Sequence, residues 1–383
     1  MGEGDEEGRV AMNNLFIPLN VTSKYAICGL PLRVDTYKTC SFGCKYCFAN
    51  YRKVMNFNET LKLGDVGWVR NKLKKVFDYC HYNKESFLDQ LIVDGITWHC
   101  GGMSDPFQVA EKEYNVTADL VDVTNEYDID ILFSTKSDKT YNADINPNNH
   151  SFQLSVTNID DRKDIEPNVP PIKDRLAFFN KLKDEGYKVG IRLQPFIPGI
   201  TDERIVDMFR EADYVTIEGL KLVPQDMEHR KEMLKLTGMK EEDFVQMGLL
   251  NMKPEIRMEL YKGVRARLEE YGIPYSLADN DFHNFSSSKC CCGGPLVKKS
   301  TNFNNTAMYF KNTTYTLQDV ENELGPYKGC KASHLVASNR VEGCKTVMDF
   351  YKKRFRRKSS PFSRRFLYID PEQSFLEQYN QGG

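Results

Sequence analysis

The sequence predicts an α/β fold: a partial (β/α)6 parallel barrel with a cysteine-containing C-terminal appendage. Short apolar, β-branched runs alternate with helix-periodic stretches about six times, which is typical of parallel strands joined by helical crossovers. The last hundred or so residues lack this alternation. An open doubly wound sheet is the alternative architecture for the same alternation of strands and helices. In a parallel barrel the chemistry lies at the C-terminal ends of the strands, so we look for the site there.

Strands and helices are expected in a regular order along the first 282 residues. The strands are short apolar runs, and the helices show apolar residues at helical spacing, with Pro171 and Gly186 marking the two ends of one helix. Strands are predicted at 32–36, 91–102, 128–137, 152–158, 188–199 and 212–222. Helices are predicted at 59–80, 109–127, 171–185, 202–211 and 225–271, the last of which precedes the segment 274–281.

The 383 residues divide into three expected parts. Residues 1–24 begin with the acidic, Gly-rich stretch MGEGDEEG and are expected to be a flexible N-terminal segment. Residues 25–282 carry the strand–helix alternation and should form the core barrel. Residues 283–383 form a cysteine-bearing, basic C-terminal extension. The formal net charge of -2 therefore hides a segregation of charge between the acidic N-terminus and the basic 352–365.

Eleven cysteines in a long chain with no export signal favour metal binding in a reducing cytoplasm over a disulfide framework. No apolar run reaches the length that a membrane-spanning helix requires, so we predict a cytoplasmic protein that has no membrane partner. The sequence gives no indication of the oligomeric state.

The most specific motif is the loop TCSFGCKYCFAN, in which Cys40, Cys44 and Cys47 have C-x3-C-x2-C spacing. Thiolates are the ligands of iron–sulfur clusters. Three thiolates on a 4Fe–4S cubane leave one iron without a protein ligand, and that iron can bind a group of another molecule. Tyr46 is suited to form a wall for an adenine ring. Structural zinc is the alternative, but it requires four ligands and no fourth cysteine is nearby.

This loop resembles that of the radical S-adenosylmethionine (SAM) superfamily, and four later segments resemble its spore photoproduct lyase and photolyase-like branch. The similarity spans residues 25–282. It implies an enzyme that cleaves SAM at a 4Fe–4S cluster to a 5′-deoxyadenosyl radical, supplied with electrons by a flavodoxin- or ferredoxin-like reductant. The similar segments are CGGMSDPFQ (100–108), STKS (134–137), SVTNIDDRKDIEPNVPPIKDRL (155–176) and RLQPFIPGITD (192–202).

The resemblance also implies roles for single residues. Gly101 and Gly102 would let the backbone approach the methionine amino group, since glycine has no Cβ. Lys136 would pair with the SAM carboxylate, Ser155 would bind the methionyl end or the ribose, and Arg192 is a further SAM contact. The alternatives are a simple turn at the glycines, a solvated surface charge at Lys136 and a core hydroxyl at Ser155.

One position departs from the branch. Spore photoproduct lyases carry a hydrogen-donating cysteine just before a Ser-Asp pair, and alignment on Ser104 and Asp105 gives Gly102 at that place. Cys100 lies two residues earlier and is the candidate catalytic substitute. We favour the other interpretation, in which Cys100 is a small buried residue and the protein does not repair that lesion.

The extension adds two further features. Cys290, Cys291, Cys292, Cys330 and Cys344 could form a second iron–sulfur cluster, form a zinc site or remain unliganded, and the spacing does not separate these three. Segment 351–366 combines eight Lys or Arg with aromatic residues. This composition suits phosphate contacts and base stacking, although a solvated basic tail has the same composition.

Three hypotheses of function follow. The leading one is a radical SAM enzyme that repairs or modifies a nucleic-acid base or nucleotide. The second is a radical SAM enzyme that modifies a peptide or protein with the help of an auxiliary cluster in the extension. The third is a metal-dependent nucleic-acid-binding protein without turnover.

Overall fold

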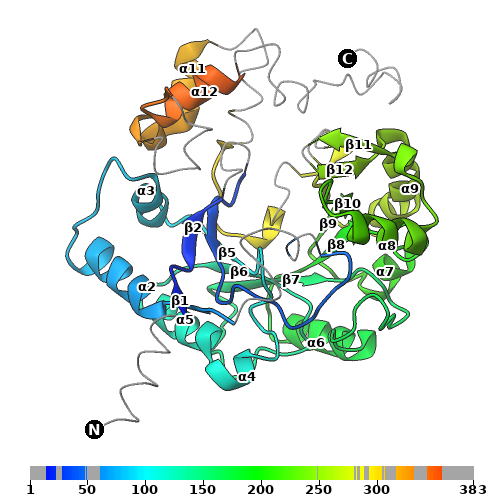
Figure 1. Ribbon diagram of the computed structural model, residues 1–383. Helices are drawn as coiled ribbons and strands as arrows, with labels where there is room; N and C mark the ends of the chain where they lie inside the picture. The colour runs from blue at the N-terminus through cyan, green and yellow to red at the C-terminus, as the bar shows by residue number, and fades with distance from the viewer. Residues whose placement is uncertain are drawn as a thin grey trace.

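The computed structural model describes most of the chain (Figure 1). The described residues are 14–22, 28–47, 49, 61–247, 249–279, 282, 285–288, 293–303, 306, 316–331 and 343–355. Cys290, Cys291 and Cys292 and most of the basic segment lie outside them.

An eight-stranded sheet forms the centre of the molecule, in the order β13-β9-β8-β7-β6-β5-β3-β2. The seven strands from β3 to β13 pair in parallel, and β2 pairs antiparallel with β3. Because β2 and β13 lie at opposite edges, the barrel is partial, as predicted. The strands are β2 (Leu19–Val21), β3 (Leu32–Val34), β5 (Trp98–Cys100), β6 (Ile131–Thr135), β7 (His150–Ser155), β8 (Val189–Phe196), β9 (Tyr214–Gly219) and β13 (Tyr275–Leu277).

Helices between the strands cover one face of this sheet and enclose the main hydrophobic core. Alternate strand residues such as Phe133, Phe152 and Ile191 point into that core, as expected for side chains that alternate between two faces. The helices are α2 (Val66–Leu73), α3 (Phe87–Val93), α4 (Glu111–Tyr114), α5 (Val116–Asn125), α6 (Ile172–Asp184), α7 (Arg204–Met208) and α9 (Pro254–Glu270). No helix among the described residues is long and apolar enough to cross a membrane.

The strand predicted over 91–102 is wrong in its first half. Leu91 to Val93 are the last turn of α3, whose first turn is capped by the Ser86 side chain accepting from the Asp89 N–H. Gly95, with φ +64°, then turns the chain into β5. The apolar run is too short to distinguish a helical from an extended period. The side-chain cap at Ser86 favours the helical conformation for residues 87–93.

The helix predicted over 225–271 is also wrong, because it is two helices separated by a β-hairpin. Helix α8 (Met227–Thr237) ends at Gly238, whose φ is +68°, and a hairpin of β11 (Phe244–Met247) and β12 (Leu249–Met252) follows before α9. With β10 (Lys221–Leu222) the hairpin forms a separate three-stranded antiparallel sheet. We call residues 220–253 the β9–α9 insertion.

Two other predicted helices differ at their ends. In the helix predicted over 59–80, Leu63–Gly64 form strand β4 beside β1 (Leu15–Phe16), α2 begins at Val66, and a π-helical turn follows over Lys74–Asp78. The helix predicted over 109–127 is divided between α4 and α5 at Asn115, whose φ is +52°.

Residues beyond the predicted core boundary also pack against the barrel. The turn Gly294–Leu296 joins Leu30, Leu132 and Tyr214 in a small apolar cluster at the N-terminal end of the strands. A Cβ added to Gly190 on β8 would lie 2.7 Å from Leu296 Cδ1, so the turn is seated directly on the sheet. This end of the barrel is therefore closed by apolar side chains.

A later described part of the extension, 316–331 with 343–355, packs near α3. Helices α11 (Leu317–Leu324) and α12 (Val347–Phe355) lie side by side near α3 in Figure 1. Tyr327 donates a hydrogen bond to Asp94, and its ring centroid lies 5.5 Å from that of Phe87.

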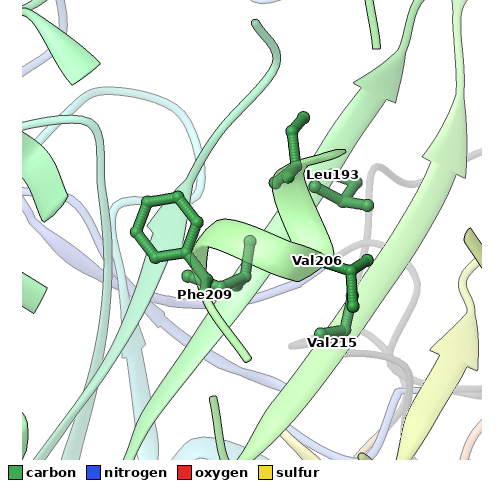
Figure 2. A pocket seen from close by; sticks show the side chains of 6 residues that line it. Leu193, Val206, Phe209 and Val215 are labelled. Atoms are coloured by element: carbon green, nitrogen blue, oxygen red, sulfur yellow. The ribbon is translucent and has the colours of Figure 1, made fainter. Parts of the chain in front are cut away.

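Figure 2 shows a small apolar pocket where α7 packs on β8 and β9. All of its lining residues are aliphatic or aromatic, so it is a packing defect of the core and offers no polar group for chemistry. They are Ile191, Leu193, Ile205, Val206, Phe209 and Val215.

Candidate active site

The cysteine loop follows β3 and is held against two neighbouring segments. The Ser41 N–H donates to Gln108 Oε1 at 2.6 Å, and Gln108 Nε2 donates to the Thr39 carbonyl at 2.7 Å. The Lys45 N–H donates to the Ile165 carbonyl at 2.9 Å. The segments after β5 and after β7 therefore fix the path of the loop.

All three cysteines of the motif contact one apolar cluster. Cys44 is buried in it, and Cys40 and Cys47 pack against it from partly buried positions. The cluster also contains Phe42, Ile165 and residues of the β9–α9 insertion, which therefore covers this side of the loop. The insertion members are Leu220, Leu222, Met233, Phe244 and Met252.

Burial makes thiolates unfavourable here unless a cation compensates them. It raises the pKa of Cys40 to about 12, with a further contribution from Asp105. It also raises the pKa of Cys44 well above 9, although the charge of Lys136 opposes this. Bound metal deprotonates a coordinating thiol outright, so the surroundings of Cys40 and Cys44 suit metal binding.

A single metal ion and a cubane cluster place different demands on the side chains that bind them. Within the described ranges, no three Cys, His, Asp or Glu side chains are grouped so that they could hold one ion. A cubane makes a different demand, since each of its thiolates binds a different iron. Three thiols on one short loop are the donor chemistry of such a cluster.

A buried acid–base cluster lies beside the loop. Glu166 Oε1 accepts a hydrogen bond from the Tyr46 hydroxyl and lies 2.9 Å from Lys136 Nζ. Its Oε2 accepts from Asn158 Nδ2 at 2.6 Å and lies 4.0 Å from Arg175 Nη2. Burial alone would raise the pKa of Glu166, but the charges of Lys136 and Arg175 outweigh it, so the pKa is lowered and the carboxylate is ionised.

Lys136 is not a solvated surface charge. Its side chain is 12% exposed, and Nζ lies 5.4 Å from the centre of the Tyr46 ring and 3.3 Å from Thr157 Oγ1. Its backbone N–H donates to Asp105 Oδ2 at 2.6 Å. Burial raises the pKa of Asp105 to about 6, and this carboxyl ties the turn after β5 to the end of β6.

The two positions after β5 are glycines for different structural reasons. Gly101 has a φ of +92°, and an added Cβ would lie 2.2 Å from the Ser134 carbonyl oxygen, so no other residue fits. At Gly102 an added Cβ would meet Arg33 Nη1 at 2.4 Å, which is the movable end of a side chain. Gly101 is thus required by packing whatever the turn binds.

Ser155 and Arg192 face each other in register on β7 and β8. The Ser155 carbonyl accepts from Arg175 Nη1 at 3.0 Å, and its side chain makes no hydrogen bond within the described chain. Arg192 Nη1 donates to Gln153 Oε1 at 3.1 Å. Ser155 is the last residue of β7, and the register of β6, β7 and β8 places Ser155 and Arg192 at about the level of Lys136.

Cys100 lies away from these groups. It is fully buried in the core between the sheet and the helices, whereas its neighbour His99 faces the opposite side and meets Ser134. In the extension, the Cys330 thiol donates to the carbonyls of Lys84 and Pro326 at 3.9 and 3.8 Å, and burial raises its pKa to about 11. Cys344 is partly buried on the same core.

A second ionic cluster, which the sequence did not reveal, lies where β9 and β13 end. Arg257 Nη1 lies 3.2 Å from Asp279 Oδ1, and the Tyr261 hydroxyl donates to Asp279 Oδ2 at 2.7 Å. Lys221 forms an ion pair with Glu218. Asp279 lies 22 and 18 positions from Arg257 and Tyr261, so no local pattern could have identified these two contacts, whereas Lys221 and Glu218 are three residues apart.

The comparisons with known proteins give partial matches. No family model matches the chain. An uncharacterized protein of Methanocaldococcus jannaschii is 25% identical over 192 residues, which are 48% of this chain and 66% of that protein. The chain therefore spans just under two thirds of the curated relative that it matches.

Two solved structures represent the similar folds. A spore photoproduct lyase mutant with bound AdoMet and dinucleoside spore photoproduct has a TM-score of 0.47 at 16% identity, over 69% of this chain and 81% of that one. The radical S-adenosylmethionine methyltransferase TsrM of Kitasatospora setae has a TM-score of 0.43 at 12% identity, over 70% and 58%.

Proposed function

We propose that this protein is a radical SAM enzyme whose Cys40, Cys44 and Cys47 hold a 4Fe–4S cluster. One observation carries the proposal. The three thiols contact one apolar cluster beside the ends of parallel strands, and Tyr46 and Lys136 stand next to them. The cluster would supply the electron that cleaves SAM to methionine and a 5′-deoxyadenosyl radical.

The residues of the chain have separate tasks in this proposal. Tyr46 forms a wall beside the loop, and Glu166 orients both its hydroxyl and the Lys136 ammonium. Lys136 attracts the SAM carboxylate, and Ser155 offers a hydroxyl from the neighbouring strand. The β9–α9 insertion shields the loop from water and oxygen on one side, because its apolar residues pack against the cysteines.

We further propose that the substrate is a nucleic-acid component. The resemblance of the motifs to the spore photoproduct lyase branch supports this, and so does the basic, aromatic composition of 351–366. The position of Gly102 argues against repair of the same lesion, since this turn carries no thiol there.

The test is the formation of 5′-deoxyadenosine from SAM by anaerobic, reduced protein. Wild type should form it, and Cys44→Ala should not. Cys28→Ala is the matched control, because Cys28 is also buried but donates to the Leu30 carbonyl at the opposite end of the barrel. Equal formation by wild type and Cys44→Ala would reject the proposal. No formation by iron-loaded wild type would favour a binding protein without turnover.

A further inference from the structure

The face of the sheet opposite the helices carries a continuous layer of polar side chains. Five neighbouring strands, β5, β6, β7, β8 and β9, contribute one residue each, and register places Ser134 opposite Gln153 and Arg192 opposite Thr216. Parallel barrels usually fill this interior with branched apolar residues. Here the apolar residues Leu132 and Tyr214 lie at the N-terminal end of the strands. The polar layer is made by His99, Ser134, Gln153, Arg192 and Thr216.

Hydrogen bonds join the members of this layer into one chain. His99 Nε2 lies 2.7 Å from Ser134 Oγ, and Ser134 Oγ donates to Gln153 Oε1 at 3.4 Å. The same oxygen accepts from Arg192 Nη1 at 3.1 Å, and Gln153 Nε2 donates to Thr216 Oγ1 at 3.0 Å. The Gln153 amide is therefore held by neighbours on three strands and cannot rotate freely.

Arg192 differs from the other cations near the strand ends because its partner is not a carboxylate. Lys136, Arg175, Lys221 and Arg257 each face a carboxylate. Arg192 is partly buried, and within the described ranges its guanidinium has one side-chain partner, the neutral amide of Gln153. A guanidinium has five N–H donors and is poorly accommodated away from water without an anion.

Two further polar groups near Arg192 lack partners among the described residues. Ser276, in register with Thr216 on β13, is fully buried and its hydroxyl makes no hydrogen bond. Gln194 Oε1, two residues along β8, is buried without a donor. Buried polar groups are normally satisfied, so these atoms point to a polar molecule that binds on this face.

We propose that this layer binds the phosphate of a nucleotide substrate, with Arg192 as the anion-binding residue held in place by Gln153. The inference rests on the proposed function and deepens it, because it makes a phosphorylated nucleotide, not a free base or nucleoside, the substrate. Arg192 is in register with Ser155 on β7, and the pair Thr135 and Leu154 immediately precedes Lys136 and Ser155, so Arg192 lies at about the level of Lys136 but two strands away, about 10 Å across the sheet. SAM and substrate then use different cations, Lys136 and Arg192.

The test compares binding of the four 2′-deoxynucleosides, their 5′-monophosphates, inorganic phosphate and SAM to full-length protein. Wild type should bind at least one monophosphate about tenfold or more tightly than its nucleoside, because a charge-assisted contact is lost in the nucleoside. Arg192→Gln should remove this preference and leave the affinity for SAM within about twofold, because the proposal assigns Arg192 to the substrate phosphate in place of the SAM contact that the motif resemblance implies. Arg192→Lys should restore part of the preference, which shows that the charge matters and that the fold is retained.

Several outcomes would overturn the inference. These are no preference for phosphate in wild type, a loss of SAM affinity in Arg192→Gln with nucleotide binding unchanged, or tighter binding of an acidic peptide than of any nucleotide. Formation of 5′-deoxyadenosine reports on the proposed function separately. Its presence together with any of these outcomes would reject the phosphate site alone, and its absence would reject the enzyme assignment.

Discussion

Lys136 at the end of β6 and Glu166 in the segment after β7 form a buried ion pair, with 2.9 Å between Nζ and Oε1. The pair sits beside the cysteine loop because Tyr46, a residue of the cysteine motif, donates to the same carboxylate. It therefore connects the loop to two neighbouring strands, and any group that Lys136 attracts is placed next to the three thiols.

Glu166→Gln should strongly destabilise the protein. The change leaves Lys136 and Arg175 without their carboxylate in a site where Glu166 is 3% exposed, and removing one partner of a buried pair costs about 3–5 kcal/mol. Urea denaturation measures the free energy of unfolding. Glu126→Gln is the control, since Glu126 pairs with Arg70 on the surface and its loss should cost less than about 1 kcal/mol. Equal losses in the two variants would contradict this account of the cluster.

Gly101→Ala should be far more harmful than Gly95→Ala. Both glycines have positive φ, +92° and +64°, so both substitutions carry the cost of a left-handed conformation, about 1–2 kcal/mol. An added Cβ at Gly101 would also clash with the Ser134 carbonyl oxygen, whereas at Gly95 it meets nothing within 4 Å. The free energy of unfolding, measured by urea denaturation, should therefore fall clearly further in Gly101→Ala than in Gly95→Ala. Similar values would mean that the turn after β5 can shift away from β6.

His150 should make the fold sensitive to acid. Burial lowers its pKa from 6.5 to about 4. Its Nδ1 accepts a hydrogen bond from the Asn146 N–H, which requires this ring nitrogen to be unprotonated. The unfolded chain therefore binds a proton at a higher pH than the folded chain, and stability is lost as the pH falls from about 6.5 to about 4. The loss from this one group is about 3 kcal/mol.

His150→Gln isolates that loss, because glutamine keeps an acceptor for Asn146 and does not titrate. Chemical denaturation across this pH range should show a smaller decline of stability in His150→Gln than in wild type. Parallel pH profiles for the two proteins would show that protonation of His150 is not what destabilises the fold in acid.

Sequence patterns predicted the parallel architecture well because its strands are short apolar runs set apart by polar helices. The same reasoning failed at Leu91–Val93, which fit either period, and at the hairpin of the β9–α9 insertion, where FVQM and LLNM flank Gly248 in an otherwise polar stretch. Tyr46 and Lys136 stood out in their motifs.

The partners of those two residues were harder to find. The link from Lys136 to Glu166 crosses 30 positions of the chain, and it depends on two parallel strands lying side by side. The polar layer at Gln153 and Thr216 was missed because alternate polar residues in a strand usually face solvent, and only the curved sheet turns them inward.

The iron content of anaerobically purified protein tests the central claim most directly. Wild type and Cys28→Ala should each hold about four irons per chain at the loop, and Cys44→Ala should lose about that number. If Cys44→Ala kept the same iron as wild type, or if wild type bound none, the cysteine loop would not hold a cluster and the assignment as a radical SAM enzyme would be contradicted.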